Sequence, residues 1–87
     1  MPFQVIWTKK SKKDLKLFEK SVCERIIDKI ELLGKEDFVF LEKIKNCPDY
    51  KFRVGKYRAI IKKFPATKKL FVLRVMHRKN VYNRIRK

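Results

Sequence analysis

The spacing of apolar residues changes partway along the chain, and this change is the strongest constraint on the fold. Before residue 34, apolar side chains recur at intervals of four, four and three residues, which predicts a helix with one buried face. These residues are Val22, Ile26, Ile30 and Leu33. Gly34 is expected to end this helix as its C′ residue. From Tyr50 the interval becomes two, which is typical of strands with one buried side.

A hairpin is predicted directly after this change. Gly55-Lys56 is expected to be its two-residue loop, because glycine tolerates the backbone conformation that such tight loops need. This loop places Arg53 opposite Arg58. One face then carries Tyr50, Phe52, Val54, Tyr57, Ala59 and Ile61, and the other carries Lys51, Arg53, Arg58, Ile60 and Lys62. The first face is expected to join the core, and the second to be an exposed basic surface.

The N-terminal half predicts a strand followed by two helices. Residues 3–8 read as the strand, and Ser11 with Asp14 three residues later predicts the start of a short helix. The longer helix with the apolar face follows. Residues 35–49 are expected to form a loop or short helix packed on the core.

The C-terminal half ends with another strand and a short helix. A turn at residues 65–67 leads into a strand over residues 69–76. Its expected core residues are Phe71, Leu73 and Val75, and its expected basic-face residues are Leu70, Val72, Arg74 and Met76. Val81 and Ile85 mark one side of the final helix. The prediction is therefore a single α+β domain over residues 1–87, of order β-α-α-β-β-β. Its two N-terminal helices pack on one face of a small, largely antiparallel sheet.

Positive charge is concentrated in the second half of the chain. The net charge is +16, but residues 1–49 hold 11 bases and all nine acids, whereas residues 50–87 hold 14 bases and no acid. Such a concentration costs electrostatic self-repulsion and exceeds what solubility requires. It therefore favours a polyanionic partner, either nucleic acid or an acidic protein.

Several function classes are excluded by what the sequence lacks. No apolar run approaches the ~18–20 residues of a membrane span. Cys23, Cys47 and the single histidine have no metal-ligand spacing, and neither paired carboxylates nor a phosphate-binding glycine loop is evident. A cytoplasmic protein without metal, cofactor or membrane association is expected.

The predicted hairpin brings like charges together. Arg53 lies opposite Arg58, with Lys51 and Arg74 nearby, and like charges opposite one another destabilise a sheet. No acid follows Asp49 to neutralise them. An anion bound across the strands would remove the repulsion, and an arginine can hold two phosphate oxygens at once. The alternative is a solvated basic face.

His77, Arg78 and Tyr82 follow the last strand and are expected beside this hairpin. His77 is a candidate general acid or base, and Tyr82 is a candidate for stacking on a base. Because the basic half contains no Ser or Cys nucleophile, the substrate must supply its own. RNA does so through its 2′-hydroxyl, which attacks the adjacent phosphate while cations stabilise the developing charge.

Two segments of the chain resemble the RelE/ParE toxin superfamily. Residues 48–61 resemble its central hairpin, and residues 72–82 resemble its last strand and the ending that follows it. The motifs are Arg53-Val54-Gly55-Lys56-Tyr57-Arg58 and His77-Arg78 followed by Val81-Tyr82. The N-terminal elements and the length also agree, so the resemblance covers nearly the whole chain.

The resemblance implies a RelE-type toxin of a type II toxin–antitoxin system. Such a toxin is a ribosome-dependent endoribonuclease that cleaves mRNA in the A site without a metal and inhibits translation. It would form a hetero-oligomer with a cognate RelB-like antitoxin, and an acidic antitoxin would suit this charge. By position, the resemblance assigns catalysis to Lys51, Arg53, Arg58, His77, Arg78 and Tyr82. Either Lys51 or His77 takes the 2′-hydroxyl proton, or positioning and charge suffice.

Further contacts are expected around these residues. RNA contacts are expected from Lys51, Arg53, Lys62, Arg74 and Arg84, and antitoxin contacts from Ile60, Leu70, Val72 and Met76. Two other functions stay open. ParE-type inhibitors of DNA gyrase share the fold, and a non-catalytic RNA- or DNA-binding module would also account for the charge.

Overall fold

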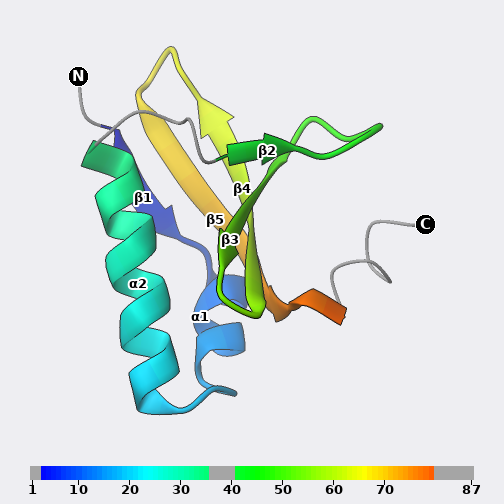
Figure 1. Cartoon of the computed structure of the whole chain (residues 1–87). Coiled ribbons are helices and arrows are strands. Elements are labelled where there is room, and N and C mark those ends of the chain that lie inside the picture. The colour runs from blue at the N-terminus through cyan, green and yellow to red at the C-terminus, as the bar shows by residue number, and fades with distance from the viewer. Residues whose placement is uncertain (1–2, 36–40, 80–87) are drawn as a thin grey trace.

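Five strands and two helices form within residues 3–35 and 41–79, the ranges that this computed structural model describes (Figure 1). They are β1 (Gln4–Trp7), α1 (Lys9–Leu15), α2 (Lys20–Lys35), β2 (Leu41–Lys43), β3 (Tyr50–Val54), β4 (Tyr57–Phe64) and β5 (Lys69–His77). The predicted α+β class is confirmed. The strand β2 is an addition, because the sequence predicts a loop or short helix there and three residues are too few to show a periodicity. Residues Val81 and Ile85 of the predicted final helix lie outside the described ranges.

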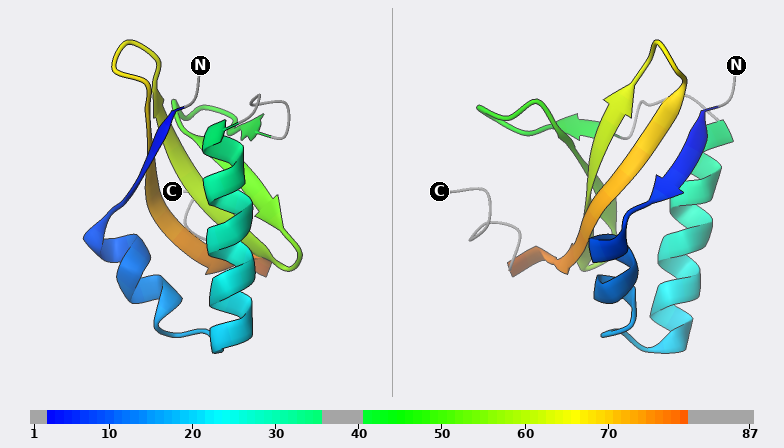
Figure 2. Two further views of the ribbon diagram at one scale, coloured as in Figure 1. Left: turned by 90° about the vertical axis from the view of Figure 1, so that its left-hand side faces the viewer. Right: turned by 180° about the vertical axis from the view of Figure 1, so that it is seen from behind.

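The sheet has the order β1-β5-β4-β3-β2. Strand β1 runs parallel to β5, and the other neighbouring pairs are antiparallel, so the prediction of a largely antiparallel sheet is confirmed. Both helices lie on one face, where their apolar side chains share a core with the strands (Figure 2). We call the other side the helix-free face. Its residues on the three longest strands include Lys51, Arg53, Arg58, Ile60, Lys62, Phe64, Lys69 and Phe71.

The core confirms the apolar spacing of α2 and of the hairpin. Ile26 and Ile30 are fully buried against alternate residues of β3 and β4, including Phe52, Ala59 and Ile61. The predicted hairpin register is also observed, with Arg53 paired to Arg58. The loop begins at Gly55, whose φ of 57° is the left-handed conformation that glycine adopts without strain.

A bulge in the β4–β5 pairing overturns part of the predicted face assignment. Ile60 pairs with Arg74 but Ile61 pairs with Val72, so Leu73 is the extra residue. Because the bulge reverses the alternation, Leu70 and Val72 face the helices instead of the basic surface and are fully buried. Leu73 and Phe71 lie away from the main core, contrary to prediction, whereas Val75 lies in it as predicted.

Helix α1 begins before the predicted position. Thr8 is its N-cap, and its side-chain oxygen accepts a hydrogen bond from the backbone N–H of Ser11. The Thr8 hydroxyl also lies 2.8 Å from Val72 O on β5, which ties the start of the helix to the sheet. Ser11 is therefore the third helical residue and is fully buried, and Asp14 is left to contact another element.

Gly34 lies inside α2 and serves as a packing residue instead of the predicted C′ residue. The backbone N–H of Phe3 donates to Gly34 O at 2.7 Å. A Cβ at this position would come within 2.8 Å of both Phe3 O and Val5 Cγ2. The first strand can approach α2 this closely only because residue 34 has no side chain.

Gly34→Ala is therefore expected to destabilise the protein, although glycine-to-alanine changes in helices usually stabilise by up to ~1 kcal/mol. The added methyl group must push backbone atoms apart, and such overpacking costs about 1–3 kcal/mol. Urea unfolding measures the change. Lys29→Ala, at an exposed position of the same helix, is the control. A Gly34→Ala protein more stable than the wild type would contradict the close approach.

Candidate functional site

The β3–β4 loop and the end of β5 come together at one end of the sheet. Tyr57 pairs with His77 in the β-ladder, and their rings meet edge to face with centroids 5.6 Å apart. The backbone N–H of Arg78 donates to Lys56 O in the loop at 2.8 Å. The fold therefore brings Arg58, His77 and Arg78 to one loop, as the sequence predicts. The His77 ring, however, lies with Tyr57 on the helix side of the sheet, whereas Arg58 belongs to the helix-free face, because neighbouring residues of a strand face opposite sides. Tyr82 and Arg84 lie outside the described residues.

Arg58 is held against the loop instead of extending into solvent. Its Nη1 donates to Gly55 O and to Tyr57 O, both at 2.8 Å, and the residue is only 7% exposed. The expectation of an exposed Arg58 is therefore wrong, because the guanidinium bonds to the loop carbonyls instead of extending into solvent. A cation fixed in this way is preorganised for charge stabilisation, since it needs little rearrangement when negative charge develops.

Arg53 is the exposed cation of the hairpin. It pairs with Arg58 across the strands, and its Nη2 lies 3.8 Å from Glu42 Oε1. Glu42 belongs to β2, where it also stands opposite Lys51. The basic face therefore has a nearby carboxylate, although none is close in sequence. With both Arg53 and Glu42 more than half exposed, this ion pair is weak and easily exchanged for an anionic ligand.

Glu42 is the site residue that the sequence argument missed. It comes from residues 35–49, which predict no strand, and its short strand shows no apolar spacing. It places a carboxylate opposite Lys51 and 3.8 Å from Arg53, which lowers the net positive charge of this part of the hairpin.

Arg74 does not belong to the exposed basic surface. Its Nε and Nη2 donate to the two oxygens of Asp14 at 2.8 and 3.0 Å, and the backbone N–H of Val75 donates to Asp14 at 2.9 Å. The hydrogen bond to Asp14 raises the pKa of Arg74, burial lowers it, and the charge of Asp14 raises it further. Arg74 thus joins α1 to β5, and the RNA contact predicted for it is not supported by its position.

The predicted antitoxin contacts are largely covered by the chain itself. Leu70 and Val72 lie in the main core, as described above. Ile60 and Met76 do lie on the helix-free face, but Ile44 packs on them and leaves them 8% and 7% exposed. This packing arises because the segment after β2 folds back over the sheet, which the sequence does not predict. Lys62, by contrast, is exposed as predicted.

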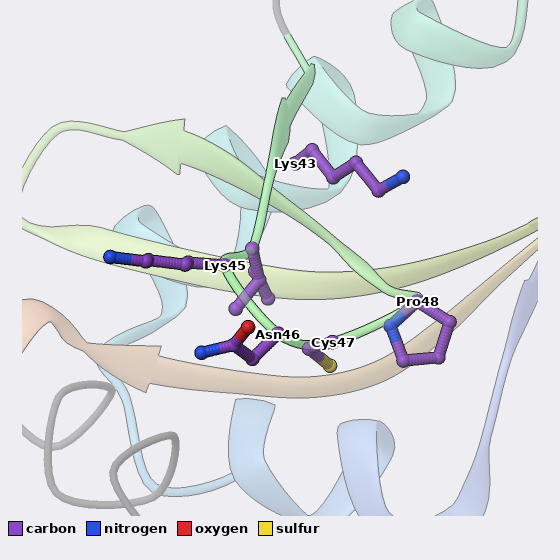
Figure 3. A pocket seen from close by; sticks show the side chains of 6 residues that line it. Lys43, Lys45, Asn46, Cys47 and Pro48 are labelled. Atoms are coloured by element: carbon purple, nitrogen blue, oxygen red, sulfur yellow. The ribbon is translucent and has the colours of Figure 1, made fainter.

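A surface hollow of about 490 Å³ lies in the connection between β2 and β3 (Figure 3). Its lining comes entirely from residues 43–48, including Lys43, Lys45 and Cys47. Binding sites usually combine polar groups from several elements. A hollow lined by one short segment is therefore a weaker candidate than the cluster at the β3–β4 loop.

Neither a metal site nor a membrane-spanning helix is found in the described residues. Within residues 3–35 and 41–79, no three His, Cys, Asp or Glu side chains come close enough to hold a metal ion. Neither helix of these ranges is long and apolar enough to span a membrane.

Known proteins resemble this chain in both sequence and fold. The model of the ParE toxin of the type II toxin–antitoxin system parDE matches residues 5–82. The RelB–RelE antitoxin–toxin complex of Methanococcus jannaschii contains a chain that is 31% identical, with a TM-score of 0.70 and coverage of 90% of this chain and 95% of that chain.

Two more distant structures share the fold. The RelBE2 toxin–antitoxin complex of Mycobacterium tuberculosis gives a TM-score of 0.78 at 19% identity, covering 88% of this chain and 92% of that one. The RelE–RelB complex of Pyrococcus horikoshii gives 0.74 at 22% identity, covering 90% and 97%. A search of curated proteins finds no match.

Proposed function

The chain belongs to the RelE/ParE superfamily of type II toxin–antitoxin toxins, and from this premise we propose that it is a ribosome-dependent, metal-independent endoribonuclease that cleaves mRNA in the A site. The observation that carries the proposal is the cluster around the β3–β4 loop. Arg58 is fixed there by two backbone carbonyls, and Arg78 is anchored to the same loop beside His77. Arg53 adds an exposed cation on the neighbouring strand.

The proposed chemistry needs no nucleophile from the protein. The 2′-oxygen of the ribose forms a bond to the adjacent phosphorus, and the bond from phosphorus to the 5′-oxygen breaks. A base removes the 2′-hydroxyl proton and an acid protonates the leaving 5′-oxygen, which leaves a 2′,3′-cyclic phosphate and a 5′-hydroxyl. The guanidinium groups stabilise the extra charge on the phosphate oxygens. His77 and Lys51 are the candidate bases, and Tyr82 is proposed to lie near the substrate.

The same charge supports the proposed partners. Residues 50–87 carry a net charge of +14, which would attract the phosphates of the ribosome and its mRNA. The same charge would attract an acidic, RelB-like antitoxin. Such an antitoxin would hold the toxin inactive as a hetero-oligomer in the cytoplasm. Three of the similar folds were solved as toxin–antitoxin complexes, RelBE2 and two RelB–RelE complexes.

Primer extension on a defined message translated by purified ribosomes tests the proposal. The toxin is expected to produce breaks within A-site codons, with 5′-hydroxyl ends downstream. Lys20→Ala, an exposed cation of α2 on the other side of the molecule, is expected to cut like the wild type. An intact message would overturn the nuclease function.

Gyrase inhibition is the second candidate, because the matching family model is that of ParE. A DNA supercoiling assay in parallel separates the two. Loss of gyrase activity together with an intact message would establish the inhibitor. Binding of RNA without either effect would leave a non-catalytic binding module.

A further inference from the structure

An exposed aromatic pair lies at the far end of the β4–β5 hairpin, away from the candidate catalytic cluster. The rings of Phe64 and Phe71 meet edge to face with centroids 5.2 Å apart. Phe64 is 40% exposed, and it is one of three large apolar residues in the described ranges that are so open to solvent. Partial burial against another ring leaves much of this aromatic surface available to a partner.

Two lysines flank the pair on the same face of the sheet. Lys62 pairs with Phe71, and Phe64 pairs with Lys69, so all four side chains belong to the helix-free face. The Nζ of Lys62 lies 5.6 Å from the centre of the Phe64 ring. Within the described residues, neither lysine forms an ion pair with a carboxylate. Aromatic rings and cations thus alternate across two adjacent strands.

This patch lies on the same strand and the same face as the candidate catalytic cluster. Arg58 and Phe64 are six residues apart on β4, which is about 20 Å at ~3.3 Å per residue. Lys62 lies between them on that face. Both helices cover the opposite side of the sheet and leave this end of the helix-free face open (Figure 2). Ile44 and the segment that follows it cover Ile60 between Arg58 and Lys62, so a single nucleic-acid strand that crosses the catalytic loop must pass over this segment to reach the patch.

We propose that Phe64 and Phe71 form a stacking platform for an unpaired base of the bound mRNA, with Lys62 and Lys69 contacting the neighbouring phosphates. The inference rests on the proposed function in taking mRNA as the strand that reaches the patch. Single-stranded nucleic acids combine bases that stack on aromatic rings with phosphates that bind lysine and arginine side chains. An acidic peptide would satisfy the lysines but would leave the rings without a matching flat partner.

The experiment uses the full-length toxin and a single-stranded RNA oligonucleotide that carries one 2-aminopurine, whose fluorescence is quenched by stacking. Wild-type protein is expected to quench the probe on binding. Phe64→Ala is expected to raise the Kd about tenfold or more and to reduce the quenching. Phe64→Tyr should retain both, whereas Phe64→Leu should behave like Phe64→Ala, since it keeps apolar area but loses the ring.

Leu32→Ala is the matched control, because Leu32 is 49% exposed on α2 and faces away from the proposed track. It is expected to bind and quench like the wild type. Thermal unfolding of each variant checks that the fold is retained. Unchanged Kd and quenching in Phe64→Ala, or no quenching by the wild type, would overturn the platform. If Phe64→Ala weakened binding of a polyglutamate peptide as much as it weakened binding of RNA, the patch would be a site for a protein partner, and the platform would also be overturned.

The outcomes separate this inference from the nuclease proposal. RNA quenching that depends on Phe64, without cleavage of mRNA on ribosomes, would keep the platform and reject the nuclease. Cleavage on ribosomes, with Phe64→Ala indistinguishable from wild type in the RNA titration, would keep the nuclease and reject the platform.

Discussion

Replacing Arg78 by alanine is expected to slow cleavage of mRNA on the ribosome by about two to three orders of magnitude while leaving thermal unfolding unchanged. The side chain is exposed, so its removal costs little stability. The bond that anchors this residue uses the backbone N–H of Arg78 and Lys56 O, and alanine keeps it. Only the cation near the reacting phosphate is lost.

Single-turnover cleavage of a ribosome-bound message measures this effect. Arg78→Lys is expected to fall between the wild type and alanine, because lysine keeps the charge but cannot hold two phosphate oxygens in a fixed plane. Lys79→Ala removes an exposed cation from the next position and is expected to have a small effect. A cleavage rate in Arg78→Ala within a fewfold of the wild type would remove Arg78 from the catalytic set.

Arg58 is a less informative position for the same experiment. Its guanidinium bonds to the carbonyls of Gly55 and Tyr57, so an alanine there removes both the proposed catalytic cation and two contacts of the hairpin loop. A lower cleavage rate in Arg58→Ala would combine loss of charge stabilisation with distortion of the loop. A substitution of the exposed Arg78 removes the charge without distorting the loop, so it tests charge stabilisation alone.

Asp14→Asn is expected to lower the free energy of unfolding by about 3 kcal/mol, because breaking one side of a largely buried ion pair leaves the other charge unpaired. The Asp14 side chain is 10% exposed and receives three hydrogen bonds, two from Arg74 and one from the backbone of Val75. At ~4–8 °C per kcal/mol for a domain of this size, the Tm should fall by roughly 12–24 °C.

A double-mutant cycle shows whether the ion pair is the cause. Arg74→Met with Asp14→Asn is expected to be less destabilised than Asp14→Asn alone, since no unpaired guanidinium remains. Glu31→Gln, which alters the exposed Trp7 Nε1–H to Glu31 hydrogen bond, is the control and should change stability by less than ~1 kcal/mol. Additive effects of the two substitutions would contradict the coupling between Asp14 and Arg74.

The sequence predicts those parts of the fold that depend on residue spacing within a single helix or hairpin. The spacing of Ile26 and Ile30 identifies the buried face of α2, and Gly55 fixes the hairpin register that sets Arg53 against Arg58. This register also leads to the prediction that the hairpin lies beside the end of β5. The roles proposed for these cations stay predictions until cleavage is measured.

The features that escape prediction depend on contacts between distant segments. A single extra residue at Leu73 reverses the facing of Leu70 and Val72, and no local pattern marks it. Asp14 resembles part of a helix start, but its partner Arg74 is 60 residues away. Similarly, the acidic neighbour of Arg53 comes from a strand too short to be recognised.

The parallel pairing of β1 with β5 has a consequence for synthesis of the protein. Among the strands of residues 3–35 and 41–79, the first in sequence, β1, pairs only with the last, β5, and the core face of α2 packs on strands that begin at residue 50. A nascent chain therefore cannot complete its sheet until residues 69–72 have left the ribosomal exit tunnel, since these contacts span nearly the whole chain. The arginines around the β3–β4 loop come together with His77 only at that point. The ribosome that makes the toxin has thus translated beyond the codons of β5 before an assembled site exists.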